Sequence, residues 1–143
     1  MRVQVQRVRD VELPAYQHAG DSGLDLVNAA GDVTLMPGER KLIPTGLKVA
    51  IPAGYEIQVR SRSGLALKKG LMVLNSPGTI DAGYRGEIGV ILYNSSSSEV
   101  KVAGNDRVAQ AVLQKVEQIC WQETSDLPES RRQEGGFGST GPC

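Results

Sequence analysis

The sequence predicts an all-β fold: a jelly-roll-like antiparallel β barrel or sandwich with one short helix and a flexible C-terminal tail. Three observations favour this class. Apolar and polar residues alternate over most of the chain, which is the period of a strand with one buried face. The 17 glycines and 7 prolines among 143 residues supply a turn roughly every ten residues, as in antiparallel sandwiches. Aromatic residues make up only 4%, so we expect a core of valine, isoleucine, leucine and alanine.

The clearest strand covers residues 55–60, where three apolar residues alternate with three polar ones. At the N-terminus, residues 3–7 alternate valine with glutamine and indicate a strand with one polar face. Shorter strands that end at proline and glycine turns are predicted at 33–36 and 47–51. The remaining predicted strands are 71–74, 87–93 and 99–102, with Asn94–Ser98 as an exposed loop before the last.

Two segments interrupt this pattern. Residues 63–70 are typical of one or two helical turns, with Ser63 as the cap and Gly70 as the stop. Residues 107–119 fit a helix and a strand equally well, because Val108, Val112 and Val116 lie on one face of either. The β-rich context favours the strand.

The composition changes after residue 122. We therefore expect residues 1–122 to form a β-barrel domain and residues 123–143 a flexible C-terminal arm. The arm is rich in glycine, serine and charge, and its only large apolar residues are Leu127 and Phe137. It cannot bury enough surface to offset its ordering entropy. Phe137, the only phenylalanine, therefore calls for a role outside the core.

Charge and cysteine content exclude several classes of function. The formal net charge is 0, so the chain has no field to hold nucleic acid or a membrane surface, and any phosphate ligand should be small and held locally. Two cysteines and one histidine are too few for a disulfide framework or a zinc site. We expect Cys120 to be a buried inert thiol, and His18 and Trp121 to fill core or surface. Residues 1–10 resemble neither a signal peptide nor a membrane span, which favours a cytoplasmic protein.

Four polar, glycine-containing clusters could bind phosphate, at residues 60–64, 75–87, 104–110 and 134–141. Each has an ordinary structural explanation: a helix cap, a turn with a surface ion pair, a hairpin turn and a mobile tail. The last cluster also lacks the Gly-Lys-[Ser/Thr] ending of a Walker motif. Alone, each is weak evidence.

Together with residues 19–26, these clusters occur in a specific order. The chain resembles the trimeric dUTP pyrophosphatase (dUTPase) family along nearly its whole length, and all five family motifs are present. They are Ala19–Leu26, Arg62–Ala66, Asn75–Glu87, Asp106–Gln110 and Arg132–Gly141. The third and fifth are the most specific.

The resemblance implies hydrolysis of dUTP to dUMP and pyrophosphate, which keeps uracil out of DNA and supplies dUMP. Asp81 would be the general base for a water that attacks the α-phosphorus in line. Asp25 would hold Mg²⁺ through a metal-bound water, since substrate phosphates supply other ligands. The resemblance also implies a homotrimer.

The same resemblance implies the substrate contacts. Arg62, Ser63 and Gln110 would bind the triphosphate, and Tyr84 would pack on the deoxyribose and leave no room for a 2′-hydroxyl. The tail would arrive from a neighbouring subunit and close over the site, with Phe137 stacking on uracil and Arg132 reaching the γ-phosphate. The full implied binding set is Arg62, Ser63, Gly64, Asn75, Gly78, Thr79, Ile80, Tyr84, Gln110, Arg132, Phe137, Gly138, Ser139 and Thr140.

Two positions depart from the family pattern. Gln133 follows Arg132 where the family usually has glycine, and Asn105 precedes Asp106 where glycine is usual. Asparagine tolerates a positive φ better than most residues, so the second turn should survive.

Two alternatives remain: a dCTP deaminase-related enzyme, which shares the architecture, and a nucleotide-sensing or protein-binding module. The Phe137 motif and Tyr84 favour the pyrophosphatase over the deaminase. The presence of both Asp25 and Asp81 argues against an inactive protein.

Overall fold

The computed structural model describes residues 1–131, 133 and 134, and in that part the chain forms eleven strands and one short helix. The fold is an all-β, jelly-roll-like arrangement of antiparallel sheets, as predicted. The elements are β1 (Gln4–Arg7), β2 (Leu24–Val27), β3 (Val33–Leu35), β4 (Arg40–Pro44), β5 (Leu47–Ala50), β6 (Tyr55–Arg60), α1 (Ser63–Lys69), β7 (Leu71–Val73), β8 (Gly78–Ile80), β9 (Gly89–Asn94), β10 (Val100–Val102) and β11 (Arg107–Lys115).

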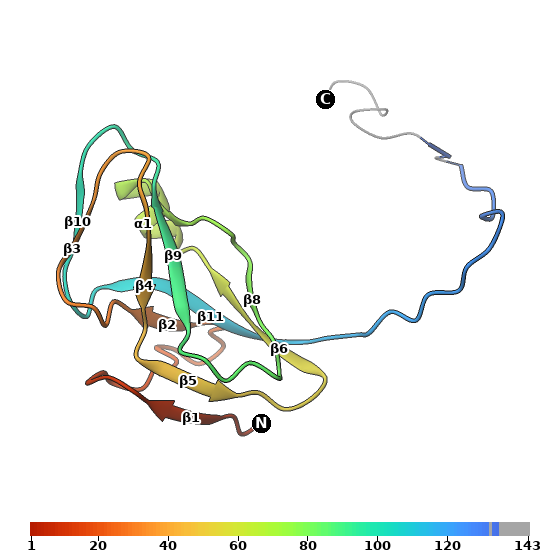
Figure 1. The fold of residues 1–143 in the computed structure, drawn as a ribbon, viewed down its shortest axis with the longest axis horizontal. Helices are drawn as coiled ribbons and strands as arrows, with labels where there is room; N and C mark the ends of the chain where they lie inside the picture. Colours follow the sequence, from red (N-terminus) through yellow and green to blue (C-terminus); the bar gives the residue numbers. More distant parts are fainter. Residues whose placement is uncertain (132, 135–143) are drawn as a thin grey trace.

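Two of the sheets carry most of the core. One has the order β2-β11-β6-β8 and the other the order β4-β9-β7, and two-stranded pairs β1-β5 and β3-β10 complete the body (Figure 1). Alternation places Val90 and Leu92 of β9 inside with no exposed surface. None of the buried apolar residues in the described part is aromatic, which confirms the predicted aliphatic core.

Three strands were not predicted from the sequence. β4 is short, contains Arg40 and Lys41 and ends at Pro44, so its pattern is not that of a buried strand. β2 and β8 lie within stretches that are typical of loops, because Gly23 directly precedes β2 and Gly78 is the first residue of β8. β8 is a strand because residues 78–80 pair with residues 57–59 of β6.

The helix α1 has the predicted position but not the predicted cap. Its N-cap is Arg62, with extended φ and ψ of −89° and 123° and no capping side chain, so Ser63 is the first helical residue instead. The C-terminal end agrees with the prediction. Gly70 is left-handed with φ of 64°, and its N–H donates to the Ala66 carbonyl over 3.1 Å.

The ambiguous segment after residue 107 is a strand, as the β-rich context favours. β11 pairs with β2 on one side and β6 on the other, and Val108 and Val112 are buried. The strand ends at Lys115 rather than near Ile119, because the pairing with β6 ends where Lys115 meets Tyr55.

Beyond β11, residues 116–131 form neither helix nor strand and lead away from the sheets (Figure 1, blue). Cys120 is exposed, so the prediction of a buried thiol was wrong: the strand has already ended and no sheet covers this stretch. Trp121 is also exposed.

The predicted exposed loop at 94–98 needs one correction. Asn94 is fully buried as the last residue of β9, because its side-chain amide donates to the carbonyls of Leu35 and Ser98. The Asn94 amide thus satisfies two carbonyl groups, one at the end of β3 and one in the loop after β9. No helix in the described residues is long and apolar enough to cross a membrane.

The N-terminal strand leaves its apolar side outside the core. Every residue of β1 is exposed, and Val5 retains 43% of its surface. Val5, Leu13 and Tyr16 instead line a groove of about 300 Å³ with residues of β2, β5, β6 and β11. The residues that line this groove are all apolar or aromatic.

Candidate active site

Three charged residues from distant motifs form an ion-pair cluster. The Asp25 carboxylate of β2 lies between two guanidinium groups, with Arg62 Nε 2.9 Å from Oδ1 and Arg107 Nη1 3.3 Å from Oδ2. Arg62 Nη1 also donates to the Arg107 carbonyl over 3.1 Å. The Asp25 side chain is 22% exposed and that of Arg107 50%, so the cluster stays open to solvent on one side.

The sheet register brings these residues together. β11 lies between β2 and β6, and Gln110 is opposite Asp25 on one side and Arg60 on the other. The pairing with β2 shifts register between Arg107 and Ala109, at the start of β11. Motifs one, two and four therefore meet at one end of this sheet.

Gln110 fixes the loop that leads into the helix. Its side-chain amide donates to the Ser61 carbonyl over 3.0 Å. The Gln110 side chain also passes close to Gly23, where an added Cβ would lie only 2.6 Å from Oε1. The glycine of motif one thus makes room for the glutamine of motif four.

Next to this cluster is a cavity of about 350 Å³, which we call the cationic cavity. Its walls include Arg62, Lys69 and Arg107 against a single carboxylate, that of Asp106. The three cations outnumber the Asp106 carboxylate and the adjacent Asp25 carboxylate that pairs with both arginines, so this site suits a small polyanion that competes with Asp25. Ser63 and Gly64 are exposed at the start of α1, directly after Arg62.

A second cavity of about 270 Å³ gathers the residues of motif three, and we call it the motif-three cavity. Val59, Val73, Leu42 and Ile91 form its apolar walls. The predicted site residues that line it are Asn75, Gly78, Thr79, Ile80, Asp81 and Tyr84. A cavity with apolar walls and a few polar groups suits a flat ring that forms hydrogen bonds along its edge.

Local contacts shape the polar end of this cavity. An added Cβ at Gly78 would lie 3.2 Å from Asn75 Nδ2, so glycine lets the amide approach the backbone of β8. Asp81 directly follows β8 and is exposed, and its carbonyl accepts the Tyr84 N–H over 3.0 Å. This turn places the carboxylate and the phenol on the same rim.

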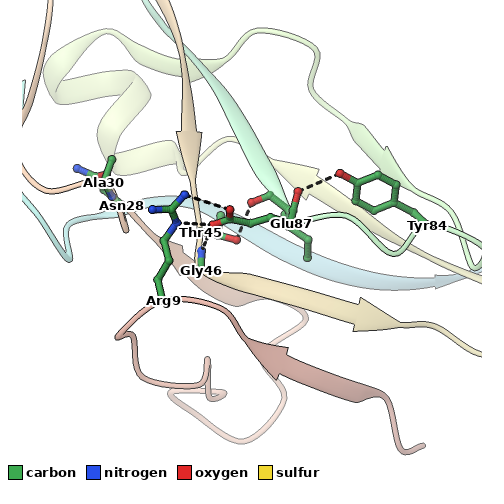
Figure 2. Close-up of polar contacts among 8 residues, drawn as sticks. Arg9, Asn28, Ala30, Thr45, Gly46, Tyr84 and Glu87 are labelled. Atoms are coloured by element: carbon green, nitrogen blue, oxygen red, sulfur yellow. Dashed lines mark hydrogen bonds and ion pairs between the residues drawn. The ribbon is translucent and has the colours of Figure 1, made fainter.

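Gly86 and Glu87 hold the Tyr84 ring in place. The ring lies against Gly86, where the Cβ of any other residue would collide with the phenol hydroxyl. That hydroxyl donates to the Glu87 carbonyl over 3.0 Å (Figure 2). The Glu87 carboxylate accepts from Arg9 Nε over 2.7 Å and from the Gly46 N–H over 2.9 Å, and these bonds, Arg9 foremost, lower the pKa of Glu87.

The predicted site residues thus fall into two groups in a single chain. The linings of the cationic and motif-three cavities have no residue in common. The predicted tail residues Arg132, Phe137, Gly138, Ser139 and Thr140 lie outside the described part of the chain.

Both departures from the family pattern have left-handed backbone. Asn105 has φ of 65° and Gln133 has φ of 46°, while no other non-glycine residue in the described part has a positive φ. The expectation for Asn105 is confirmed, since asparagine keeps the conformation that glycine would adopt. At Gln133 the same conformation carries a cost for a longer side chain.

Sequence reasoning missed several residues at these cavities. Arg107 lies inside motif four, and its charge beside Asp106 was the available signal. Lys69, in the last turn of α1, is outside the five motifs, yet it lines the cationic cavity. Leu42 had no signal, because β4 itself was not predicted. The described residues contain no group of three or more His, Cys, Asp or Glu side chains suited to a metal ion.

Comparisons with known proteins agree with the motif order. The model of the dUTPase family matches residues 9–141. The chain is 51% identical over 143 residues to the deoxyuridine 5′-triphosphate nucleotidohydrolase of Fusobacterium nucleatum, covering 98% of both chains. It is 51% identical to the enzyme of the same name from Hydrogenobaculum, covering 99% of both. Among solved structures, the dUTPase of Staphylococcus bacteriophage 80alpha with dUpNHpp superposes with a TM-score of 0.90 at 27% identity, covering 99% of each chain.

Proposed function

The chain belongs to the dUTPase family, and from this premise we propose that it is a dUTP diphosphatase that hydrolyses dUTP to dUMP and pyrophosphate. The observation that carries the proposal is the motif-three cavity, whose apolar walls end at the paired rim residues Asp81 and Tyr84. The deaminase and sensing alternatives gain no support, since the family model and the curated relatives are dUTP hydrolases.

Uracil would bind in the motif-three cavity. The Asn75 amide and the main chain of Gly78–Ile80 would read the hydrogen-bonding edge of the base, while the close apolar wall excludes the thymine methyl. Unpaired polar groups reject a mismatched base more strongly than a close wall rejects a methyl group, so we expect cytosine to be excluded more strictly than thymine. Tyr84 would lie against the deoxyribose.

The triphosphate would bind to cationic groups of the other cavity. Arg62 lines this cavity, and Gln110, whose amide donates to the Ser61 carbonyl beside it, would supply a further donor. Ser63 and Gly64 offer a hydroxyl and a backbone N–H at the start of α1. Arg107 and Lys69 add positive charge. Little covalent chemistry is needed from the protein, because phosphoryl transfer depends mainly on positioning and charge neutralisation.

Asp81 would act as the general base. Its carboxylate would accept a proton from a water molecule as that water attacks the α-phosphorus. The bond from that phosphorus to the bridging oxygen of the β-phosphate then breaks, so pyrophosphate leaves and the water oxygen stays on dUMP. The exposed position of Asp81 at the end of β8 leaves room for both water and phosphate.

Mg²⁺ is the cofactor that the family implies, and Asp25 is the residue that would hold it. A lone carboxylate fits Mg²⁺ that keeps its waters and takes further ligands from the substrate phosphates. When bound, the ion would neutralise phosphate charge. Asp25 would orient one of the metal-bound waters, and Arg62 and Arg107 would exchange the carboxylate for phosphate oxygens.

The separation of the two cavities supports a homotrimer. Since no lining residue is shared within one chain, a complete site would combine the cationic cavity of one subunit with the motif-three cavity of another. The apolar groove beside β1 offers surface that a second subunit would bury. Residues 1–122 would then be the catalytic domain, and residues 123–143 an arm whose Phe137, Arg132, Gly138, Ser139 and Thr140 close over a neighbouring site.

Hydrolysis in H₂¹⁸O tests the reaction and the position of attack together. With Mg²⁺ and dUTP we expect pyrophosphate release, with the label in dUMP. Label in pyrophosphate would contradict attack at the α-phosphorus, and no turnover of dUTP would overturn the proposal. dCTP serves as the control substrate, because ammonia release from it would indicate the deaminase instead.

A further inference from the structure

Arg9 belongs to no sequence motif, yet it contacts the motif-three segment. It lies between β1 and β2, and its guanidinium donates two hydrogen bonds to Glu87, Nε to Oε1 over 2.7 Å and Nη2 to Oε2 over 3.2 Å (Figure 2). Both oxygens of one carboxylate are thereby held by one planar group. Such a bidentate pair restricts orientation as well as distance.

The backbone around Glu87 is held on its other side by the turn between β4 and β5. The Gly46 N–H donates to Glu87 Oε1 over 2.9 Å. The Thr45 hydroxyl and N–H both donate to the Ile88 carbonyl, over 2.7 and 3.1 Å, and the Ile88 N–H donates to Leu47 over 2.8 Å. Residues 87 and 88 are thus fixed between the N-terminal segment and β5.

The carbonyl of this fixed residue orients Tyr84. The phenol hydroxyl donates to the Glu87 carbonyl over 3.0 Å, and the ring rests on the bare backbone of Gly86. Tyr84 is 44% exposed, so packing covers only part of it. The hydrogen bond at the far end of the ring is therefore a contact that fixes the ring position.

We propose that Arg9 is a positioning residue for sugar specificity. Its two hydrogen bonds to the Glu87 carboxylate hold Glu87 in place, and the Glu87 carbonyl in turn orients the Tyr84 ring against the substrate sugar. This inference rests on the proposed function, which assigns the deoxyribose contact to Tyr84. The Arg9 side chain is 45% exposed, so the ion pair contributes little to overall stability. Its effect should therefore appear in specificity rather than in folding.

The first test compares the ratio of kcat/KM for dUTP and UTP among variants. Arg9→Leu should lower this ratio about threefold to tenfold, the range expected when one neutral hydrogen bond is lost, with little change in melting temperature. Arg9→Lys keeps the positive charge but cannot donate two parallel hydrogen bonds to the carboxylate, so we expect a ratio between those of Arg9→Leu and the unmodified chain. Lys41→Met removes another surface ion pair, with Glu39, and should leave the ratio unchanged.

A double-mutant cycle separates positioning from a general effect. Tyr84→Phe removes the hydroxyl through which Arg9 would act. Arg9→Leu combined with Tyr84→Phe should therefore lose no more discrimination than Tyr84→Phe alone. Additive losses would overturn the inference, because Arg9 would then act by another route.

Fluorine NMR gives a readout that does not depend on turnover. The chain has four tyrosines, so 3-fluorotyrosine labelling gives one resonance each, and the Tyr84 resonance is the one missing in Tyr84→Phe. Arg9→Leu should shift or broaden that resonance, and Lys41→Met should not. An unchanged resonance and ratio in Arg9→Leu, with a changed ratio in Tyr84→Ala, would refute the role of Arg9 and leave the proposed function standing. Absent dUTP turnover with a shifted resonance would instead contradict the proposed function.

Discussion

The Asp25 carboxylate and the Arg62 guanidinium form an ion pair, with 2.9 Å between Oδ1 and Nε. The proposed metal carboxylate and the proposed phosphate ligand thus neutralise each other in the free chain, with Arg107 as a second partner of Asp25. A polyphosphate that binds here has to compete with this carboxylate for the same donors.

Asp25→Asn should therefore separate phosphate binding from metal-dependent turnover. Removing the negative charge frees Arg62 and Arg107, so a non-hydrolysable dUTP analogue should bind at least as tightly without Mg²⁺ as it does to the unmodified chain. Turnover stimulated by Mg²⁺ should fall strongly. Calorimetry with and without Mg²⁺ measures the first effect, and weaker metal-free binding in the variant would contradict competition within the ion pair.

Asp81→Asn should still bind the nucleotide but should lose most of its hydrolytic activity. The amide retains the size of the carboxylate and cannot accept the proton of the attacking water, so kcat should drop about 10²–10⁴-fold, the usual contribution of a general base. Binding of the dUTP analogue should change little. Near-normal turnover would remove Asp81 from the role of base.

Much of this fold could be predicted, because in the longer strands apolar and polar residues alternate clearly in the sequence. The alternation at 55–60 corresponds to β6, whose bounds are the same residues. β8 could not be predicted, because it shows no period and exists only through its pairing with β6. The equally short β3, β7 and β10 lie within predicted strands. β4 could not be predicted for another reason: Arg40 and Lys41 are followed by Leu42 and Ile43, so polar and apolar residues do not alternate along it.

The candidate site could be proposed as a set of residues but not as a geometry. The residues of motif three are neighbours in sequence, yet the apolar walls of their cavity come from other strands, through Leu42, Val59, Val73 and Ile91. The contact of Asp25 with Arg107 joins two paired strands that are far apart in sequence, which no local pattern shows. Arg9 could not be found at all, because its partner Glu87 is 78 residues away.

Tyr84→Ala should admit UTP. The ring lies at the rim of the motif-three cavity, and its removal opens space where a 2′-hydroxyl would otherwise meet the aromatic face. We expect kcat/KM for UTP to rise relative to that for dUTP by about tenfold or more, the scale of one steric contact in a specific site. Steady-state kinetics with both nucleotides measures it. If the two substrates keep their original ratio, another residue excludes the ribose.

Deleting residues 133–143 should abolish activity and spare the fold. The buried apolar residues of the described chain lie between Val11 and Val112, so the body does not depend on the tail. Loss of the proposed stacking of Phe137 on uracil alone removes on the order of 1–3 kcal/mol of binding. Calorimetric melting and sedimentation should match the full chain, and a clearly lower melting temperature would show that the tail supports the core.

The ion pair of Glu87 with Arg9 predicts a small loss of stability in acid, because the pair is partly exposed to solvent. The hydrogen bond from Arg9 holds the pKa of the Glu87 carboxyl below its ordinary value of 4.5, assisted by the Gly46 N–H and the charge of Lys48. A carboxyl whose pKa is lower in the folded state stabilises the fold above its unfolded pKa, and that share is lost as the pH falls through the folded pKa.

Glu87→Gln should therefore be slightly less stable than the unmodified chain at neutral pH, and this small difference should shrink once the pH falls below 4.5. Urea unfolding over this range measures the free energy of unfolding for both proteins. Glu129→Gln is the matched control, because Glu129 is exposed in the C-terminal segment and its replacement should give no pH-dependent difference. A constant gap between Glu87→Gln and the unmodified chain at every pH would mean that the charge of Glu87 contributes nothing, and that only the shape of its side chain matters.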